Sequence, residues 1–184
     1  EFPYPTEYDP PQVPQQVGGP INFGGVLIDT SPPEVVPIPP STPTAFDMRK
    51  VGSLLEIEAV IARERERGIV ANRIVLMGFS QGCALTLMTG LRHAETLGGL
   101  IGLSGYLPIA ATTAAERHAA NQATPIFMAH GRDDDIVAIE RATASRDALQ
   151  TLGYGIEWHD YEMPHSVCMD EITDIQNWLL RVLG

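Results

Sequence analysis

The chain has 184 residues, 44% of them apolar, which suits one domain with a substantial core and is too little for two. Its formal net charge of -11 argues against nucleic-acid and anionic-membrane partners, and no apolar run approaches the ~20 residues of a membrane span. The two cysteines, Cys83 and Cys168, form no disulfide framework, so we expect reduced thiols in a cytoplasmic protein.

Residues 1–45 differ in composition from the rest of the chain. Twelve of the fifteen prolines fall there, and no lysine or arginine precedes Arg49. Because proline lacks an N–H and fixes its own φ, we expect a mostly extended arm with one short strand at 25–28. Whether this arm is loose or covers part of the functional face is left open. We treat residues 1–184 as one domain, with 46–184 as its core.

From residue 47 the sequence alternates between helical and strand patterns. Apolar side chains recur at helical spacing up to Gly68, which predicts a helix over 51–67. Short apolar runs predict strands, and the periodic segments between them predict helices. The strands are 74–77, 100–104, 126–129 and 156–161, and the helices are 81–93, 110–120, 139–152 and 170–183. This alternation is typical of a parallel α/β sheet flanked by helices.

A candidate nucleophile directly follows the first of these strands. The sequence there is Gly78-Phe79-Ser80-Gln81-Gly82. A Gly-x-Ser-x-Gly sequence between a strand and a helix predicts a sharp turn that exposes the serine hydroxyl. Because the turn is strained, we expect a Cβ at either flanking glycine to collide with the neighbouring strand or helix. Ser104, which lacks the second glycine at the right place, is a weaker candidate.

Candidates for an acid and a base lie after two later strands. Asp133, Asp134 and Asp135 follow the strand at 126–129, and His165 follows the strand at 156–161. In parallel α/β sheets the site lies beyond the carboxyl ends of the strands. A serine hydroxyl becomes a nucleophile when an imidazole takes its proton, and a carboxylate fixes that imidazole. The chain order Ser, Asp, His is the order of the α/β-hydrolases.

The other histidines are weaker candidates for the base. His159 lies within a strand, where a packed or surface position is typical, and His130 ends a strand, where we expect a hydrogen bond to the aspartate loop. For His93 and His118 we expect solvent-exposed positions.

Four motifs in unbroken order over residues 46–184 resemble the phospholipase/carboxylesterase family, which includes the acyl-protein thioesterases. They are Gly78-Phe79-Ser80-Gln81-Gly82, Leu103-Ser104-Gly105-Tyr106-Leu107-Pro108, His130-Gly131-x-x-Asp134-x-x-Val137 and Tyr161-x-Met163-x-His165-Ser166. The resemblance implies an α/β-hydrolase fold with Ser80 as nucleophile, Asp134 as orienting acid and His165 as base. It also makes Leu107, Val137 and Met163 candidates for an apolar acyl groove, with ordinary core positions as the alternative.

The resemblance is incomplete at the oxyanion hole. The backbone N–H of Gln81, the residue after the nucleophile, supplies one donor. In the family a second donor comes from a loop with a His-Gly-Leu-Gly-Asp-like motif, and nothing in residues 1–77 matches it. The second donor is therefore unknown, and the resemblance implies a hydrolase shortened at its N-terminus.

The sequence thus predicts a serine carboxylesterase for small to medium acyl esters or thioesters, with no metal or organic cofactor. One alternative is a catalytically weak or inactive α/β-hydrolase relic that serves as a binding module. The other is a cutinase- or lipase-like hydrolase, which the low cysteine content disfavours. A homodimer is left open. A disulfide between Cys83 and Cys168 is also left open, with an inert buried pair as the favoured arrangement.

Overall fold

The computed structural model describes residues 21–23, 26–28 and 52–184, with side chains from Leu54 onward. The chain divides into two units, Glu1–Thr42 and Pro43–Gly184, and each is described by itself. In the first unit, β1 (Ile21–Phe23) pairs antiparallel with β2 (Val26–Ile28). The short strand expected at 25–28 is therefore present. The other predictions for residues 1–45, including a cover over the functional face, lie outside the described residues.

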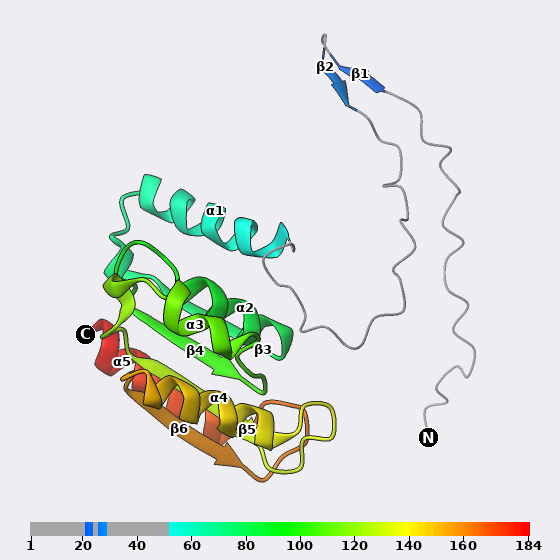
Figure 1. Ribbon diagram of the computed structural model, residues 1–184, viewed down its shortest axis with the longest axis vertical. Coiled ribbons are helices and arrows are strands. Elements are labelled where there is room, and N and C mark those ends of the chain that lie inside the picture. The colour runs from blue at the N-terminus through cyan, green and yellow to red at the C-terminus, as the bar shows by residue number, and fades with distance from the viewer. Residues whose placement is uncertain (1–20, 24–25, 29–51) are drawn as a thin grey trace, which may run out of the picture. The chain divides into compact units, whose positions relative to one another are not determined.

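The second unit is built on a four-stranded sheet in which all neighbouring strands are parallel (Figure 1). Its order is β3-β4-β5-β6, so consecutive strands are also neighbours. The strands are β3 (Val75–Phe79), β4 (Gly99–Leu103), β5 (Ile126–Gly131) and β6 (Ile156–Tyr161). Every strand predicted in this part of the chain is present, and the α/β fold class is confirmed.

Helices precede, connect and follow these strands at the places that the periodicity predicts. They are α1 (Gly52–Glu66), α2 (Gln81–Gly90), α3 (Ala110–Glu116), α4 (Ile139–Thr151) and α5 (Met169–Leu183). The helices expected over 81–93 and 110–120 end three and four residues early, and a 3-10 turn at Ala119–Asn121 follows the second. Of the helices described in residues 52–184, none has the length and apolarity that crossing a membrane requires.

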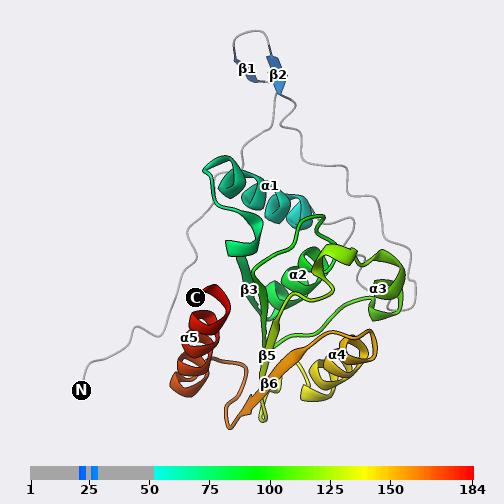
Figure 2. The same ribbon diagram turned by 90° about the vertical axis from the view of Figure 1, so that its left-hand side faces the viewer.

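Two apolar layers cover the two faces of the sheet, with α5 on one side and α2 and α4 on the other (Figure 2). Successive side chains of a strand point to opposite faces. Leu100 of β4 therefore packs with α2 and α4, while its neighbour Ile101 packs with Ile175 and Trp178 of α5. All residues of β4 and β5 are buried, as expected for central strands covered on both sides.

The position of α1 corrects one expectation about the histidines. This helix packs against α2, with Ile61 almost fully buried. His93, which follows α2, is buried at 9% exposure, and its Nδ1 lies 2.9 Å from Glu58 Oε2 of α1. The prediction of an exposed His93 is therefore wrong, because α1 covers the end of α2. His118 is exposed, as predicted.

A buried carboxyl group at the start of α5 gives the fold a specific pH dependence. Glu171 is fully buried, and burial raises its pKa to about 7. The unfolded chain ionises this group near pH 4.3, so the native state binds more protons between about pH 4.3 and pH 7. The free energy of unfolding must therefore fall as pH rises through that window.

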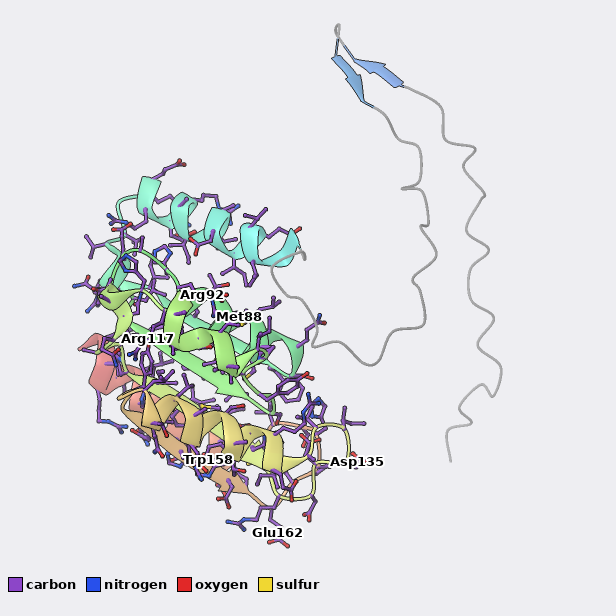
Figure 3. All side chains as sticks on the ribbon, viewed as in Figure 1. Met88, Arg92, Arg117, Asp135, Trp158 and Glu162 are labelled. Atoms are coloured by element: carbon purple, nitrogen blue, oxygen red, sulfur yellow. The ribbon has the colours of Figure 1, made fainter. Side chains whose placement is uncertain are left out.

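We expect Glu171→Gln to lose less stability than the wild-type protein between about pH 4.3 and pH 8, because the variant has no carboxyl to ionise. Urea unfolding at several pH values measures the slope of the free energy of unfolding against pH. Glu162→Gln is the matched control, since Glu162 lies exposed on the loop after β6 (Figure 3). Equal slopes in Glu171→Gln and the wild type would contradict the assignment.

Candidate active site

The Ser80 turn is sharp, as the sequence predicts. β3 ends at Phe79 and α2 begins at Gln81, so one residue makes the change of direction. Ser80 has φ 55° and ψ -115°, a conformation that costs a residue with a Cβ on the order of 1–3 kcal/mol. Main-chain hydrogen bonds hold it there, from Ser80 N to Leu103 O at 2.8 Å and to Ser80 O from Cys83 N at 3.1 Å and Ala84 N at 3.5 Å.

The two glycines of the motif have different roles. A Cβ on Gly78 would lie 2.2 Å from the carbonyl carbon and oxygen of Gly82, which no side chain can approach so closely. A Cβ on Gly82 would meet nothing within 4 Å. The predicted collision is confirmed for Gly78 and wrong for Gly82, because Gly78 faces the first turn of α2 while Gly82 faces open space.

The side chains of Asp134 and His165 meet beyond the carboxyl ends of β5 and β6. His165 Nδ1 lies 2.7 Å from Asp134 Oδ2, while the other carboxylate oxygen accepts the N–H groups of Ile136 and Val137 at 2.9 and 2.8 Å. Burial by itself raises the pKa of Asp134, but the hydrogen bonds from Val137, His165 and Ile136 outweigh it and hold the pKa below its usual value. The carboxylate is therefore ionised at neutral pH.

Of the neighbouring aspartates and histidines, only His130 also approaches the Asp134 carboxylate among the described side chains, with its Nε2 3.3 Å from Oδ2. Asp133 and Asp135 are exposed, and Asp135 lies on the loop that follows β5 (Figure 3). His130 is fully buried behind Asp134, and its Nε2 is 2.8 Å from the carbonyl oxygen of Val137, so its predicted bond to this loop is confirmed. His159 instead stacks on Phe127, with ring centroids 4.9 Å apart.

The His165 loop also reaches the Ser80 turn. β3 and β6 form the two edges of the sheet, so Ser80 and His165 follow strands separated by β4 and β5. The centroid of the His165 ring nevertheless lies 4.7 Å from that of Phe79, the residue before Ser80. Among the residues with described side chains, neither the Ser80 hydroxyl nor His165 Nε2 has a hydrogen-bond partner, so the two groups are not hydrogen-bonded to each other in this structure.

A cavity of about 350 Å³ opens beside Ser80. It is lined by Ser80, Gln81, Ala84, Tyr106, Pro108, Val137 and Arg141. Of the three residues expected in an acyl groove, Val137 is on this wall, whereas Leu107 and Met163 are not. Leu107 is buried in the apolar layer under α2 and α4, and Met163 is buried where its main chain packs against Gly131.

Three cavity residues, Ala84, Tyr106 and Arg141, were not singled out from the sequence. Tyr106 and Pro108 flank Leu107, so the motif located the segment but not the side chains that face the cavity. Ala84 and Arg141 lie four residues after Ser80 and Val137. For Ala84, a spacing of one helical turn from Ser80, the N-cap of α2, is the signal that could have found it.

The two cysteines are free thiols, so the disulfide left open by the sequence is not formed. Cys83 is fully buried behind the Ser80 turn, and burial raises its pKa to about 12. A Cβ on Gly105 would lie 2.5 Å from Cys83 Cβ, so this thiol fills a close contact between α2 and the segment after β4. Within residues 52–184, no three His, Cys, Asp or Glu side chains are grouped as metal ligands would be.

A family model described as phospholipase/carboxylesterase matches residues 48–183. The chain belongs to the phospholipase/carboxylesterase family. Acyl-protein thioesterase 1 of Yarrowia lipolytica is 43% identical to this family member over 130 residues, which are 69% of this chain and 57% of that protein. The protein of the same name from Gibberella zeae is 41% identical over 127 residues, 67% of this chain and 54% of that protein. The chain thus spans little more than half the length of these curated relatives.

Solved structures show the same relationship. The crystal structure of Arabidopsis thaliana SOBER1 is 32% identical with a TM-score of 0.68, and the match covers 71% of this chain and 63% of that one. Esterase PE8 is 27% identical with a TM-score of 0.65, over 69% of this chain and 59% of that one. The family resemblance that the four sequence motifs indicate is therefore confirmed.

The unequal crowding at the two motif glycines predicts unequal costs for the same substitution. We expect Gly78→Ala to lower the free energy of unfolding by about 1–3 kcal/mol, as overpacking does, because the new methyl group meets main-chain atoms. Gly82→Ala is the matched control and should change it by about 0.5 kcal/mol or less. Urea unfolding of both variants measures the difference. Similar losses of unfolding free energy in Gly78→Ala and Gly82→Ala would contradict the conclusion that only Gly78 is crowded.

Proposed function

We propose that this protein is a serine carboxylesterase that hydrolyses small to medium acyl esters or thioesters through an acyl-enzyme on Ser80. The observation that carries the proposal is the 2.7 Å contact between His165 Nδ1 and Asp134 Oδ2, on loops that meet beside the Ser80 turn. Membership of the phospholipase/carboxylesterase family supports it, as do relatives named acyl-protein thioesterase 1.

In the proposed mechanism Asp134 accepts the Nδ1–H of His165, which leaves Nε2 as the base. Nε2 takes the proton of the Ser80 hydroxyl as Ser80 Oγ attacks the acyl carbon. The C–O or C–S bond to the leaving group breaks, and the imidazolium returns the proton to that group. A water molecule, deprotonated by the same nitrogen, then releases the acid and restores Ser80.

The main-chain N–H of Gln81 is one proposed donor to the oxyanion. Gln81 is the first residue of α2, where an N–H has no intrahelical acceptor, and it lines the cavity with Ser80. The positive end of the helix dipole adds to its effect. A second donor stays unassigned. Ala84, Pro108 and Val137 give the cavity an apolar wall for an acyl chain, and its volume of about 350 Å³ suits a chain of small to medium length.

We propose the cytoplasm as the place of action, which two free thiols support because reducing compartments keep cysteines unpaired. The proposed partner is a small-molecule ester or thioester. Assembly as a homodimer stays a prediction, which sedimentation analysis tests.

Replacement of the nucleophile gives the direct test of activity. We expect the wild-type protein to hydrolyse a short-chain p-nitrophenyl ester and Ser80→Ala to lose that activity almost completely, because no acyl-enzyme can form. Release of p-nitrophenolate measures both rates. Ser104→Ala is the matched control at the weaker candidate serine. Equal rates of hydrolysis by Ser80→Ala and the wild type would contradict the assignment of Ser80 as the nucleophile.

The hydrogen bond to His165 predicts which aspartate matters. We expect Asp134→Asn to lower kcat by about 10²-fold or more, since the amide stabilises neither the correct tautomer nor the imidazolium. Asp135→Asn removes a similar charge one residue away, from an exposed side chain, and should leave kcat within about twofold. A comparable loss in both variants would show that loop charge, rather than this contact, supports the reaction.

A further inference from the structure

A guanidinium group with no acidic partner among the described side chains lies on the wall of the Ser80 cavity. Arg141 stands in the first turn of α4, and its Cζ is 3.6 Å from the centroid of the Tyr106 ring. Both residues line the cavity together with Ser80. Among the side chains described from Leu54 to Gly184, none accepts a hydrogen bond from this guanidinium or pairs with it.

Other arginines that lie over aromatic rings are committed to acceptors. Arg117 lies 5.7 Å from the centroid of the Tyr154 ring and also donates to Gln122 Oε1. Arg146 lies 4.9 Å from the centroid of the Trp158 ring and pairs with Asp147 at 2.7 Å. Arg141 lies over the Tyr106 ring in the same way, but its N–H groups have no acceptor among the described residues and could bind a ligand.

We propose that Arg141 is a specificity-determining residue that binds a carboxylate or phosphate group on the substrate. The inference rests on the proposed function, because the anion would be bound while the acyl carbon lies at Ser80. A planar guanidinium forms two parallel hydrogen bonds to either anion, and stacking on Tyr106 reduces the side-chain entropy lost on binding.

The charge around the site makes this cation distinctive. The chain carries a formal net charge of -11. Asp133, Asp135 and Glu140 are exposed, and they are close in sequence to the cavity residues Val137 and Arg141. An anionic substrate therefore gains nothing from the overall field of the protein. Preference for such a substrate would depend on a local contact, and Arg141 is the cation among the residues that line the cavity.

Matched esters test the inference. The p-nitrophenyl monoester of adipic acid and p-nitrophenyl hexanoate have acyl chains of equal length, and the first ends in a carboxylate. We expect Arg141→Gln to lower the ratio of kcat/KM for the anionic ester over the neutral ester by about five- to tenfold, mainly through KM. The ratio for Arg141→Lys should lie between those of the wild type and Arg141→Gln, since lysine keeps the positive charge but cannot form two parallel hydrogen bonds to the anion.

A second pair of esters distinguishes an anion on the leaving group from one on the acyl chain. It consists of p-acetoxybenzoate and its neutral methyl ester. If Arg141→Gln loses the preference for the anionic ester in the first pair, Arg141 binds an anion on the acyl chain. If it loses that preference in the second pair, Arg141 binds an anion on the leaving group. Arg63→Gln, an exposed arginine of α1 outside the cavity, is the control and should alter neither ratio. Unchanged ratios in Arg141→Gln for both pairs would overturn the inference.

A binding measurement separates this inference from the proposed function. The p-nitroanilides of adipic and hexanoic acid occupy the site without turnover, and titration calorimetry with Ser80→Ala measures their Kd. We expect Arg141→Gln in that background to weaken the adipic anilide about five- to tenfold more than the hexanoic one. Equal weakening of the two overturns the role of Arg141. Failure of the wild type to hydrolyse any of the esters contradicts the proposed function alone.

Discussion

The contact between His165 Nδ1 and Asp134 Oδ2 is the interaction on which the site depends, and the pairing of β5 with β6 places it. Gly131 and Tyr161 are opposite each other at the ends of these strands, so their loops leave the sheet at one level. The loops are then joined by main-chain hydrogen bonds, from Arg132 N to Tyr161 O at 2.8 Å and from Asp133 N to Met163 O at 3.2 Å. Asp134 and His165 are therefore positioned by backbone structure before any substrate binds.

The same arrangement explains which parts of the site could be predicted from the sequence. Buried parallel strands appear in the sequence as apolar runs, and their carboxyl ends share one edge of the sheet. The sequence alone therefore predicts that the loops with Ser80 and His165 lie at the same edge. Choosing among three adjacent aspartates needed the family motif. The physical reason for that choice is the structure of the loop, which buries Asp134 under two N–H donors and leaves Asp133 and Asp135 exposed.

The wall of the cavity could not be predicted in this way, because the segment after β4 follows no regular period. Ser104 and Ile109 both have positive φ, at 45° and 51°, and neither is a glycine that would signal such a conformation. These two turns direct Tyr106 and Pro108 into the cavity and Leu107 into the core. Loop residues with unusual backbone angles thus form one wall of the cavity, on a framework set by regular strands.

Site-specific labelling with a fluorophosphonate tests most directly whether the Ser80 turn and the His165–Asp134 pair form one nucleophilic unit. The reagent forms a covalent bond with a serine Oγ that is activated by a base, and mass spectrometry locates the adduct. We predict a single adduct on the peptide with Ser80 in the wild-type protein, and labelling slowed by about 10²-fold or more in His165→Ala. Labelling at Ser104, or equal labelling of Ser80 with and without His165, would contradict this account.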